Sequence, residues 1–227
     1  APAQGKTALA LSYALNALRA GRPVLFVSLE MRDPDLSVRL ISQLSGVPFN
    51  KQREGLHRLG ERDLGRYTVA QDEAARWRHL LHIEHRGTIT PEALRLSCQR
   101  IQHEHGDLGL VVLDYIQRCK GISKRRDASE ESEIALASGM MKSCALEFET
   151  AALALSQPTT AAARAGGKAM RLSDAKGSQA IAADADVALI PHRPNPTPDI
   201  VAEPGFRGDA ARARIVSEKQ RATISLP

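Results

Sequence analysis

Short apolar runs alternate with longer amphipathic stretches along most of the 227-residue chain. Runs of aliphatic and β-branched residues bounded by glycine, proline or charged residues are typical of buried strands. Stretches in which apolar side chains recur every three or four positions are typical of helices. Strands or short apolar segments are predicted at residues 24–29, 80–83, 108–114, 151–157, 187–190, 213–216 and 223–226. Helices are predicted at residues 8–20, 35–44, 91–105 and 130–146, with further exposed helices within residues 51–78.

The order of these elements, in which helices separate the strands, predicts an α/β fold with a mostly parallel, twisted sheet that helices cover on both faces. Residues 159–168 are rich in alanine, glycine and threonine without periodicity, and we expect a mobile loop there. The proline-rich residues 191–208 are expected to form a surface insertion. The sequence contains no repeat of fixed period, so residues 1–227 are predicted to be a single domain.

Composition narrows the class of protein. Hydrophobic residues make up 43% of the chain and aromatic residues only 4%, so aliphatic side chains must fill the core. Lysine and arginine outnumber aspartate and glutamate by 31 to 26, and this net charge of +5 permits a polyanionic partner without proving one. No apolar run approaches the roughly 20 residues that span a bilayer. The three cysteines have no pair-like spacing, which suits free thiols in a reducing compartment. These features predict a cytoplasmic protein with no membrane partner.

A metal site at Cys98, His103 and His105 is the less favoured interpretation of these residues. The two histidines are two positions apart on a predicted helix, so their side chains face different directions. Solvated helix residues explain them better than a zinc site does.

Gly5, Lys6 and Thr7 match the closing half of the phosphate-binding loop G-x-x-x-x-G-K-[ST]. In this loop backbone N–H groups cradle phosphate oxygens, the lysine reaches the β- and γ-phosphates, and the hydroxyl holds Mg²⁺. The predicted helix after Thr7 directs its N–H groups and positive dipole end at the same place. An ordinary helix start, or the apolar region of a secretory signal, is the alternative. Because a strand normally precedes this loop, we expect residue 1 to be a truncation point, with the first strand of the fold missing.

Polar residues close three of the predicted strands: Glu30, Asp114 and Gln157. Ligands gather at the carboxyl ends of strands in open parallel sheets. Asp114 has the Walker B arrangement, which places a carboxylate beside the Mg²⁺ held by Thr7, although a strand-terminal aspartate can also cap a turn. Glu30 is suited to deprotonate an attacking water, or to be a helix N-terminal acid that pairs with Arg32. Gln157 is suited to sense the γ-phosphate, or to be an exposed turn residue.

Taken together, several segments of the chain resemble the RecA-like motor domain of DnaB-type replicative helicases. The matching segments are residues 2–11, 24–31, 110–117, 155–157, 172–174, 184–187 and 215–221. The resemblance implies a RecA-like P-loop NTPase fold. It also implies an ATP-dependent DNA helicase motor, which hydrolyses ATP with Mg²⁺ at the interfaces of a homo-hexameric ring. The implied partners are single-stranded DNA, primase and a helicase loader. The family's linker helix and N-terminal helical domain are expected to lie outside this chain.

The resemblance further implies roles for individual residues in the nucleotide site. Thr7 and Asp114 would hold Mg²⁺, Glu30 would be the catalytic base, and Gln157 would couple the nucleotide state to the DNA loops. The residues implied to hold the nucleotide are Gln4, Gly5, Lys6, Thr7 and Ala8.

Other implied roles lie at subunit interfaces and in the central channel of the ring. Lys219 and Arg221 would reach the γ-phosphate of the neighbouring subunit as a lysine and an arginine finger. Without the resemblance, these two residues are more simply a solvated strand edge. Cations and backbone amides in two loops would contact DNA phosphates, although each cluster can also be read as a solvated face. The residues implied to bind DNA are Arg125, Arg126, Arg164, Lys168, Lys176 and Gly177.

Two other functions fit the same sequence. A RecA-like ring ATPase that does not act on DNA would keep the nucleotide residues and show no response to single-stranded DNA. A decayed module would bind DNA or a partner without hydrolysing nucleotide.

Overall fold

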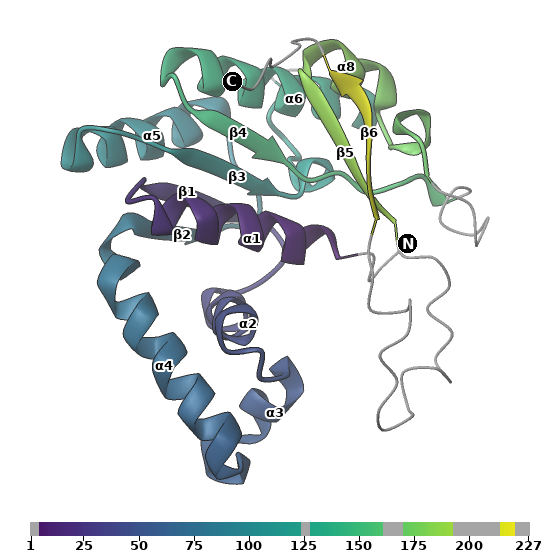
Figure 1. Cartoon of the computed structure of the whole chain (residues 1–227). Coiled ribbons are helices and arrows are strands. Elements are labelled where there is room, and N and C mark those ends of the chain that lie inside the picture. Colours follow the sequence, from purple (N-terminus) through teal and green to yellow (C-terminus); the bar gives the residue numbers. More distant parts are fainter. Residues whose placement is uncertain (1–4, 124–127, 161–169, 193–213, 221–227) are drawn as a thin grey trace.

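Four parallel strands form the central sheet of the chain, in the order β2-β1-β3-β4 (Figure 1). The structure is a computed structural model, and it describes residues 5–123, 128–160, 170–192 and 214–220. The strands are β1 (Val24–Ser28), β2 (Leu81–His85), β3 (Leu110–Asp114) and β4 (Ala151–Ala154). β2 and β4 are therefore the outer strands of this sheet.

Helices and short 3-10 turns connect these strands. The helices are α1 (Lys6–Arg19), α2 (Asp33–Ser45), α3 (Phe49–Glu54), α4 (Glu61–Trp77), α5 (Pro91–His105), α6 (Glu130–Glu147) and α8 (Ser178–Asp184). The 3-10 turns are η1 (Leu56–Arg58), η2 (Arg78–Leu80), η3 (Ile116–Arg118) and η4 (Leu172–Asp174). The predicted α/β class with a parallel sheet is confirmed.

Apolar cores cover both faces of the sheet. Successive side chains of a strand point to opposite faces, and β1 divides in this way. Val24 and Phe26 pack in a cluster with α1, α2 and the end of α4, whereas Leu25 and Val27 pack in a second cluster with α5 and α6. All five residues of β1 are buried, as expected for a strand covered on both sides. The side chains of this core are mainly aliphatic, as the composition predicts.

Local sequence signals set the ends of the helices that flank β3. Thr90 precedes α5, and its hydroxyl accepts a hydrogen bond from the Ala93 amide at 3.2 Å. Gly106 ends this helix with a φ of 74°, a left-handed conformation that glycine adopts without strain. Ser129 caps α6 in the same way as Thr90 caps α5. Thr90 and Gly106 therefore set where α5 begins and ends, and Ser129 sets where α6 begins.

A second, antiparallel pair of strands lies apart from the main sheet. β5 (Val187–His192) pairs with β6 (Arg214–Gln220), with a register shift between Ala188 and Leu189. Strands are predicted at both places, although the sequence does not specify their direction. The predicted strand at residues 223–226, and most of the predicted loop at 159–168 and insertion at 191–208, lie outside the described residues.

The three cysteines are free, as their spacing predicts, and the structure shows that all three are buried. The Cys98 and Cys144 sulfurs lie 3.4 Å apart between α5 and α6, and burial raises the pKa of Cys119 to about 12.

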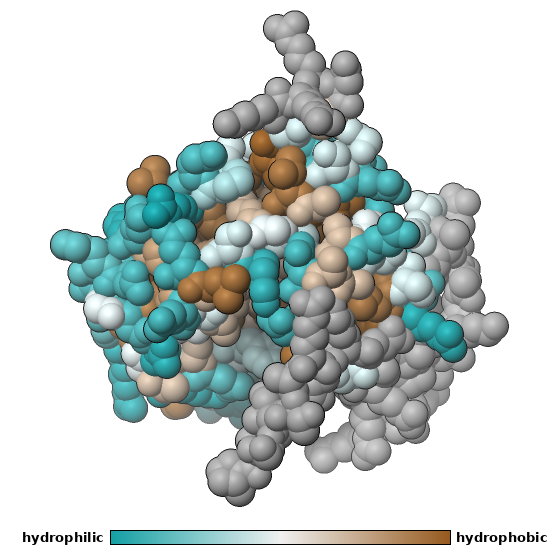
Figure 2. Space-filling view, turned by 90° about the horizontal axis from the view of Figure 1, so that it is seen from above, coloured by the Kyte–Doolittle hydropathy of each residue, from teal (hydrophilic) through white to brown (hydrophobic). Residues whose placement is uncertain are grey.

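The face of the molecule seen in Figure 2, which is the upper side of Figure 1, is mainly hydrophilic, with apolar side chains in separate patches. None of the helices in the described part of the chain combines the length and the apolar character that a bilayer crossing requires.

Candidate nucleotide site

The start of α1 forms an anion-binding surface. Gly5 immediately precedes the helix with a φ of 88°, a conformation that favours glycine because it lacks a Cβ atom. The Leu9 amide donates to the Gly5 carbonyl at 2.8 Å and closes the first turn. The amides of Lys6, Thr7 and Ala8 come before that bond, in the part of a helix where N–H groups have no intrahelical acceptor. These amides and the helix dipole together favour phosphate at this end.

Thr7 meets Asp114 across the start of α1 and the end of β3. The Thr7 hydroxyl donates a hydrogen bond to Asp114 Oδ2 at 2.9 Å, although 107 positions separate the two residues in the sequence. Asp114 is buried, and burial raises the pKa of its carboxyl, opposed by the Thr7 hydrogen bond and by the charge of Lys6. The predicted pairing of a loop hydroxyl with a strand-terminal carboxylate is present in the structure.

Lys6 reaches from the same helix start to the end of another strand. Its Nζ donates to the Ser156 carbonyl oxygen at 2.6 Å. Burial lowers the pKa of the Lys6 ammonium, and the charges of Asp114 and Glu30 oppose that effect. The sheet therefore holds a partly buried cation at its carboxyl edge, where a polyphosphate would compensate the cost of desolvation.

Glu30 lies near this pair of charges but is itself exposed. β1 ends at Ser28, two residues before Glu30, so the predicted strand at 24–29 is one residue shorter in the structure. The Leu29 amide still donates to the Asp114 carbonyl at 2.7 Å, which keeps this segment beside β3. The charge of Glu30 adds to the raised pKa of Asp114 and opposes the lowering of the pKa of Lys6 by burial. An exposed carboxylate at the rim has the freedom to contact a water molecule.

The chemistry of these donors fits a magnesium nucleotide. Mg²⁺ prefers oxygen ligands and keeps several waters, and Thr7 and Asp114 supply a hydroxyl and a carboxylate. Burial disfavours the ionised Asp114 carboxylate, and a divalent cation beside it would compensate this cost. The ammonium of Lys6 and the amides at the start of α1 are suited to phosphate oxygens.

A buried glutamine that the sequence analysis did not assign, Gln117, connects several segments beside this site. Its Nε2 donates to Ser156 Oγ at 2.8 Å and to the Lys176 carbonyl at 3.1 Å, and its Oε1 accepts from the Gln157 amide at 3.0 Å. The Lys176 amide in turn donates to the Gln157 carbonyl at 3.1 Å. Gln157 lies three residues past the end of β4. It follows Ser156, whose carbonyl accepts from Lys6, and its own carbonyl accepts from the Lys176 amide. No local pattern in the sequence marks Gln117, because its hydrogen-bond partners lie 39, 40 and 59 positions away along the chain.

Lys176 and Gly177 lie side by side before α8. The Lys176 ammonium forms an ion pair with Glu130 Oε2 at 2.5 Å, and both side chains are exposed to nearly the same extent. Gly177 has a φ of 75°, and a Cβ atom at this position would lie 2.5 Å from Ile134 Cγ2. Gly177 therefore has a backbone role in seating α8 on α6, in addition to the implied contact with DNA.

Some of the implied site residues lie partly or wholly outside the described part of the chain. Lys219 lies in β6 opposite Ala188, where the structure describes its backbone alone. The implied site residues that lie outside the described residues are Gln4, Arg125, Arg126, Arg164, Lys168 and Arg221.

Gly177→Ala is expected to lower the free energy of unfolding by about 1–3 kcal/mol, because an added methyl group would strain the left-handed backbone and collide with Ile134. Chemical denaturation monitored by circular dichroism measures this change. Gly139→Ala is the control, since Gly139 lies within α6 with open space around its Cα atom. The control should raise stability by up to about 1 kcal/mol. Equal stability of Gly177→Ala and the wild type would contradict this role.

Comparison with known proteins agrees with this geometry. A helix start suited to phosphate, in contact with a strand-terminal carboxylate at the carboxyl edge of a parallel sheet, is typical of the RecA-like P-loop nucleotide hydrolases. The family model for the DnaB-like helicase C-terminal domain matches residues 1–224. The chain belongs to this family, which is that of replicative DNA helicases.

Curated relatives and solved structures support the assignment. A replicative DNA helicase DnaB from Leifsonia xyli is 32% identical over 193 residues, which are 85% of this chain and 41% of the relative. The replicative DNA helicase DnaC of Bacillus subtilis is 30% identical over 193 residues, which are again 85% of this chain and 41% of the relative. A solved DnaB-like replicative helicase, described with its interactions with primase, has a TM-score of 0.82 at 22% identity and covers 97% of this chain and 50% of its own. A second solved structure, of an ATPase domain, has a TM-score of 0.81 at 22% identity, over 97% of this chain and 74% of its own. The chain thus spans less than half the length of these curated relatives.

Proposed function

We propose that this chain is a single motor domain of a replicative DNA helicase, which hydrolyses ATP and moves along single-stranded DNA in the cytoplasm. The observation that supports it most directly is the contact of the Thr7 hydroxyl with the Asp114 carboxylate at 2.9 Å, beside the partly buried ammonium of Lys6. The family membership of residues 1–224 supports the same activity.

Each residue of the site has a proposed task. Lys6 and the amides of Gly5, Thr7 and Ala8, together with Gln4, bind the phosphates of the nucleotide. Thr7 and Asp114 hold the magnesium ion, which supplies charge neutralisation at the transferring phosphate. Glu30 is proposed to orient the attacking water and to accept its proton, because its exposed carboxylate follows the carboxyl end of β1, near the charges of Lys6 and Asp114. Gln157 reports the state of the nucleotide to the segment that carries Lys176, through the hydrogen bonds they share with Gln117.

Cations around a cavity support the proposed contact with DNA. A cavity of about 460 Å³ lies beyond the ends of β3 and β4, and three of its lining residues are Arg118, Lys120 and Lys176. Such a surface suits a phosphodiester backbone, which needs cations and amides but no sequence-reading groups. Gly177 and, beyond the described residues, Arg125, Arg126, Arg164 and Lys168 are proposed to extend this surface. Primase and a helicase loader are proposed as protein partners of the whole helicase, in line with the solved helicase described with primase.

Assembly into a homo-hexamer is proposed to complete the active site. Lys219 and Arg221 would contact the γ-phosphate bound by the adjacent subunit, where a cation stabilises the charge that develops during phosphoryl transfer. Hydrolysis would then depend on protein concentration, because the nucleotide site of an isolated subunit lacks the two charges that a neighbouring subunit would supply.

Phosphate release with and without single-stranded DNA tests the proposal. We expect Mg²⁺-dependent ATP hydrolysis that single-stranded DNA stimulates several-fold, measured over a range of protein concentrations that includes the assembled ring. Hydrolysis without stimulation would favour a ring ATPase that does not act on DNA. Nucleotide binding without phosphate release would favour a binding module that has lost hydrolysis. Either of these results would overturn the proposed motor.

Lys176→Ala is expected to lower the affinity for single-stranded DNA and to flatten its dependence on salt. Each phosphate contact releases counterions, so losing one contact should reduce the slope of log K against log salt by about 0.7. Fluorescence anisotropy of a labelled oligonucleotide at several salt concentrations measures both quantities.

The ion pair of Lys176 with Glu130 supplies a matched control for this experiment. Glu130→Gln removes the competing carboxylate and should raise the affinity for single-stranded DNA, in the direction opposite to Lys176→Ala. If both variants bind with the wild-type affinity and salt slope, then Lys176 makes no contact with DNA.

A further inference from the structure

A cluster of two histidines and a glutamate lies away from the nucleotide site. His82 is the second residue of β2, and its Cα pairs with Leu25, whereas Asp114 pairs with Ser28 at the other end of β1. Glu104 and His105 are the last two residues of α5, which returns the chain to the amino end of β3. The cluster therefore occupies the amino edge of the sheet, and the proposed motor activity does not use it.

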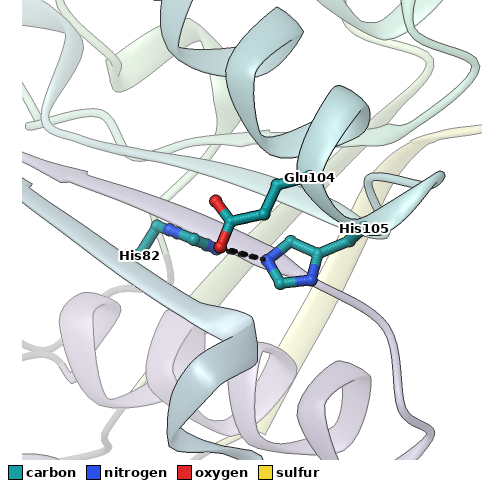
Figure 3. A group of neighbouring side chains, drawn as sticks. All are labelled: His82, Glu104 and His105. Atoms are coloured by element: carbon teal, nitrogen blue, oxygen red, sulfur yellow. Dashed lines mark hydrogen bonds and ion pairs between the residues drawn. The ribbon is translucent and has the colours of Figure 1, made fainter.

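The three side chains converge on one point (Figure 3). His82 Nε2 and His105 Nε2 lie 3.0 Å apart, and Glu104 Oε1 lies 3.7 Å from the same atom of His105. All three ligand atoms lie within 4.8 Å of one another. The His105 side chain is only 13% exposed, and the Glu104 side chain is 56% exposed. Two imidazole nitrogens thus form the protected side of the cluster, and a carboxylate closes its open side.

The surroundings leave this cluster suited to a cation. Arg100, one turn before Glu104, donates instead to Glu84 Oε1 at 3.0 Å. The ring of His79, in η2, lies 6.4 Å from that of His105 and adds a further imidazole near the cluster. The carboxylate of Glu104 lies beside the two facing nitrogens.

We propose that His82, Glu104 and His105 form a binding site for a divalent transition-metal ion, with zinc as the best match. Two histidines and one glutamate, with water in the fourth position, are a ligand set that zinc adopts at tetrahedral sites. Nitrogens at 2.0–2.1 Å from a tetrahedral ion lie about 3.4 Å apart, so the two rings need to separate by only about 0.4 Å. The ion replaces the single hydrogen bond that two neutral imidazoles share.

The bound ion would join the edge strand β2 to the end of α5. These elements come from different parts of the chain, since 23 positions separate His82 from His105. Because the site binds only in the folded chain, the ion would stabilise the fold rather than take part in hydrolysis. Cys98 and His103, which the sequence analysis considered together with His105, do not belong to this site. Cys98 lies against Cys144 in the core, and His103 is exposed.

Zinc titration of the chelator-treated, nucleotide-free chain tests this site. Isothermal titration calorimetry should show one equivalent bound, and zinc at 100 times its dissociation constant should raise Tm by about 5–10 °C. Cobalt in place of zinc should give the visible absorption of a four-coordinate ion. His82→Ala and His105→Ala should weaken zinc binding by at least about tenfold, and Glu104→Gln should weaken it as well.

Controls separate a specific site from a general loss of structure. His103→Ala removes an exposed histidine of the same helix and should bind zinc as the wild type does. Asp114→Asn should also leave binding unchanged, because Asp114 lies at the opposite edge of the sheet. His82→Gln and His105→Asn keep polar side chains, and their folding is checked by circular dichroism. The absence of a stoichiometric site in the wild type, or wild-type affinity in the folded His82 and His105 variants, would overturn the proposal.

Discussion

Lys6→Ala is expected to abolish nucleotide binding and to lower phosphate release by about 10²- to 10³-fold or more, because the ammonium is the positive side chain that we propose to meet the phosphates at the start of α1. Binding is measured with a fluorescent nucleotide analogue, and turnover is measured as released phosphate. Lys51→Ala is the control, since that lysine pairs with Asp63 on the surface. Nucleotide binding that survives in Lys6→Ala would remove the assignment of the phosphate loop.

The loss should not come from unfolding. Burial lowers the pKa of Lys6, so the folded chain holds the charged ammonium less readily than the unfolded chain does. A base with a depressed folded pKa costs stability in full at pH values below that pKa, and the cost is lost as the pH rises from the folded pKa to the higher pKa of the unfolded chain. Removing Lys6 takes away this cost together with the bond to Ser156. We therefore expect the free energy of unfolding without nucleotide to change little at neutral pH, as denaturation would show.

Glu30→Gln is expected to lower hydrolysis by about 10²- to 10⁴-fold while nucleotide binding remains, because the amide keeps the shape of the carboxylate but cannot accept a proton from water. Single-turnover phosphate release, alongside the binding assay, separates the two effects. Asp33→Asn tests the alternative role of Glu30 as an acid that favours a helix start, since Asp33 is an acid in the first turn of α2. If Asp33→Asn and Glu30→Gln reduced hydrolysis equally, the role of Glu30 as the base would be wrong.

Mixing Glu30→Gln chains with Arg221→Ala chains extends this test to the ring. Each variant alone should hydrolyse ATP poorly. At an interface where the Arg221→Ala chain supplies the base and its neighbour supplies the arginine, both groups are intact, so partial activity should return. No recovery above the two parent proteins would count against Arg221 acting on the adjacent subunit.

The sequence predicts the inner strands β1 and β3 well because both are buried along their whole length. Such strands are continuous apolar runs, and the run at 24–29 differs from β1 by one residue. The run at 151–157 is less accurate, because β4 ends at Ala154 and the chain then turns towards Gln157. α8 was not predicted, since its seven residues follow Gly177, which in a sequence resembles a break rather than a helix start. The direction of β5 and β6 depends on how they pair, which local patterns do not encode.

The residues of the candidate site also differ in how well the sequence predicts them. The loop residues and Asp114 belong to motifs with fixed spacing, so the sequence predicts that Thr7 and Asp114 meet. Gln117 has no such motif, and its importance follows from its hydrogen bonds to two other segments, at residues 156–157 and at Lys176. The proximity of His82 to His105 likewise requires knowledge of how β2 and α5 lie against each other. Contacts made by tertiary packing alone are the part that the sequence could not supply.

The two outer strands of the sheet differ in a way that affects how the chain behaves at high concentration. β2 carries His82, Glu84 and His85, and charged or ionisable side chains on an outer strand discourage other chains from adding to it. β4 consists of three alanines and a leucine, and its outward backbone groups have no neighbouring strand among the described residues. An uncharged strand edge of this kind is a template for intermolecular β-pairing. Concentrated solutions of this chain should therefore self-associate along β4 rather than β2, and a lysine introduced at the exposed Ala151 should suppress the association.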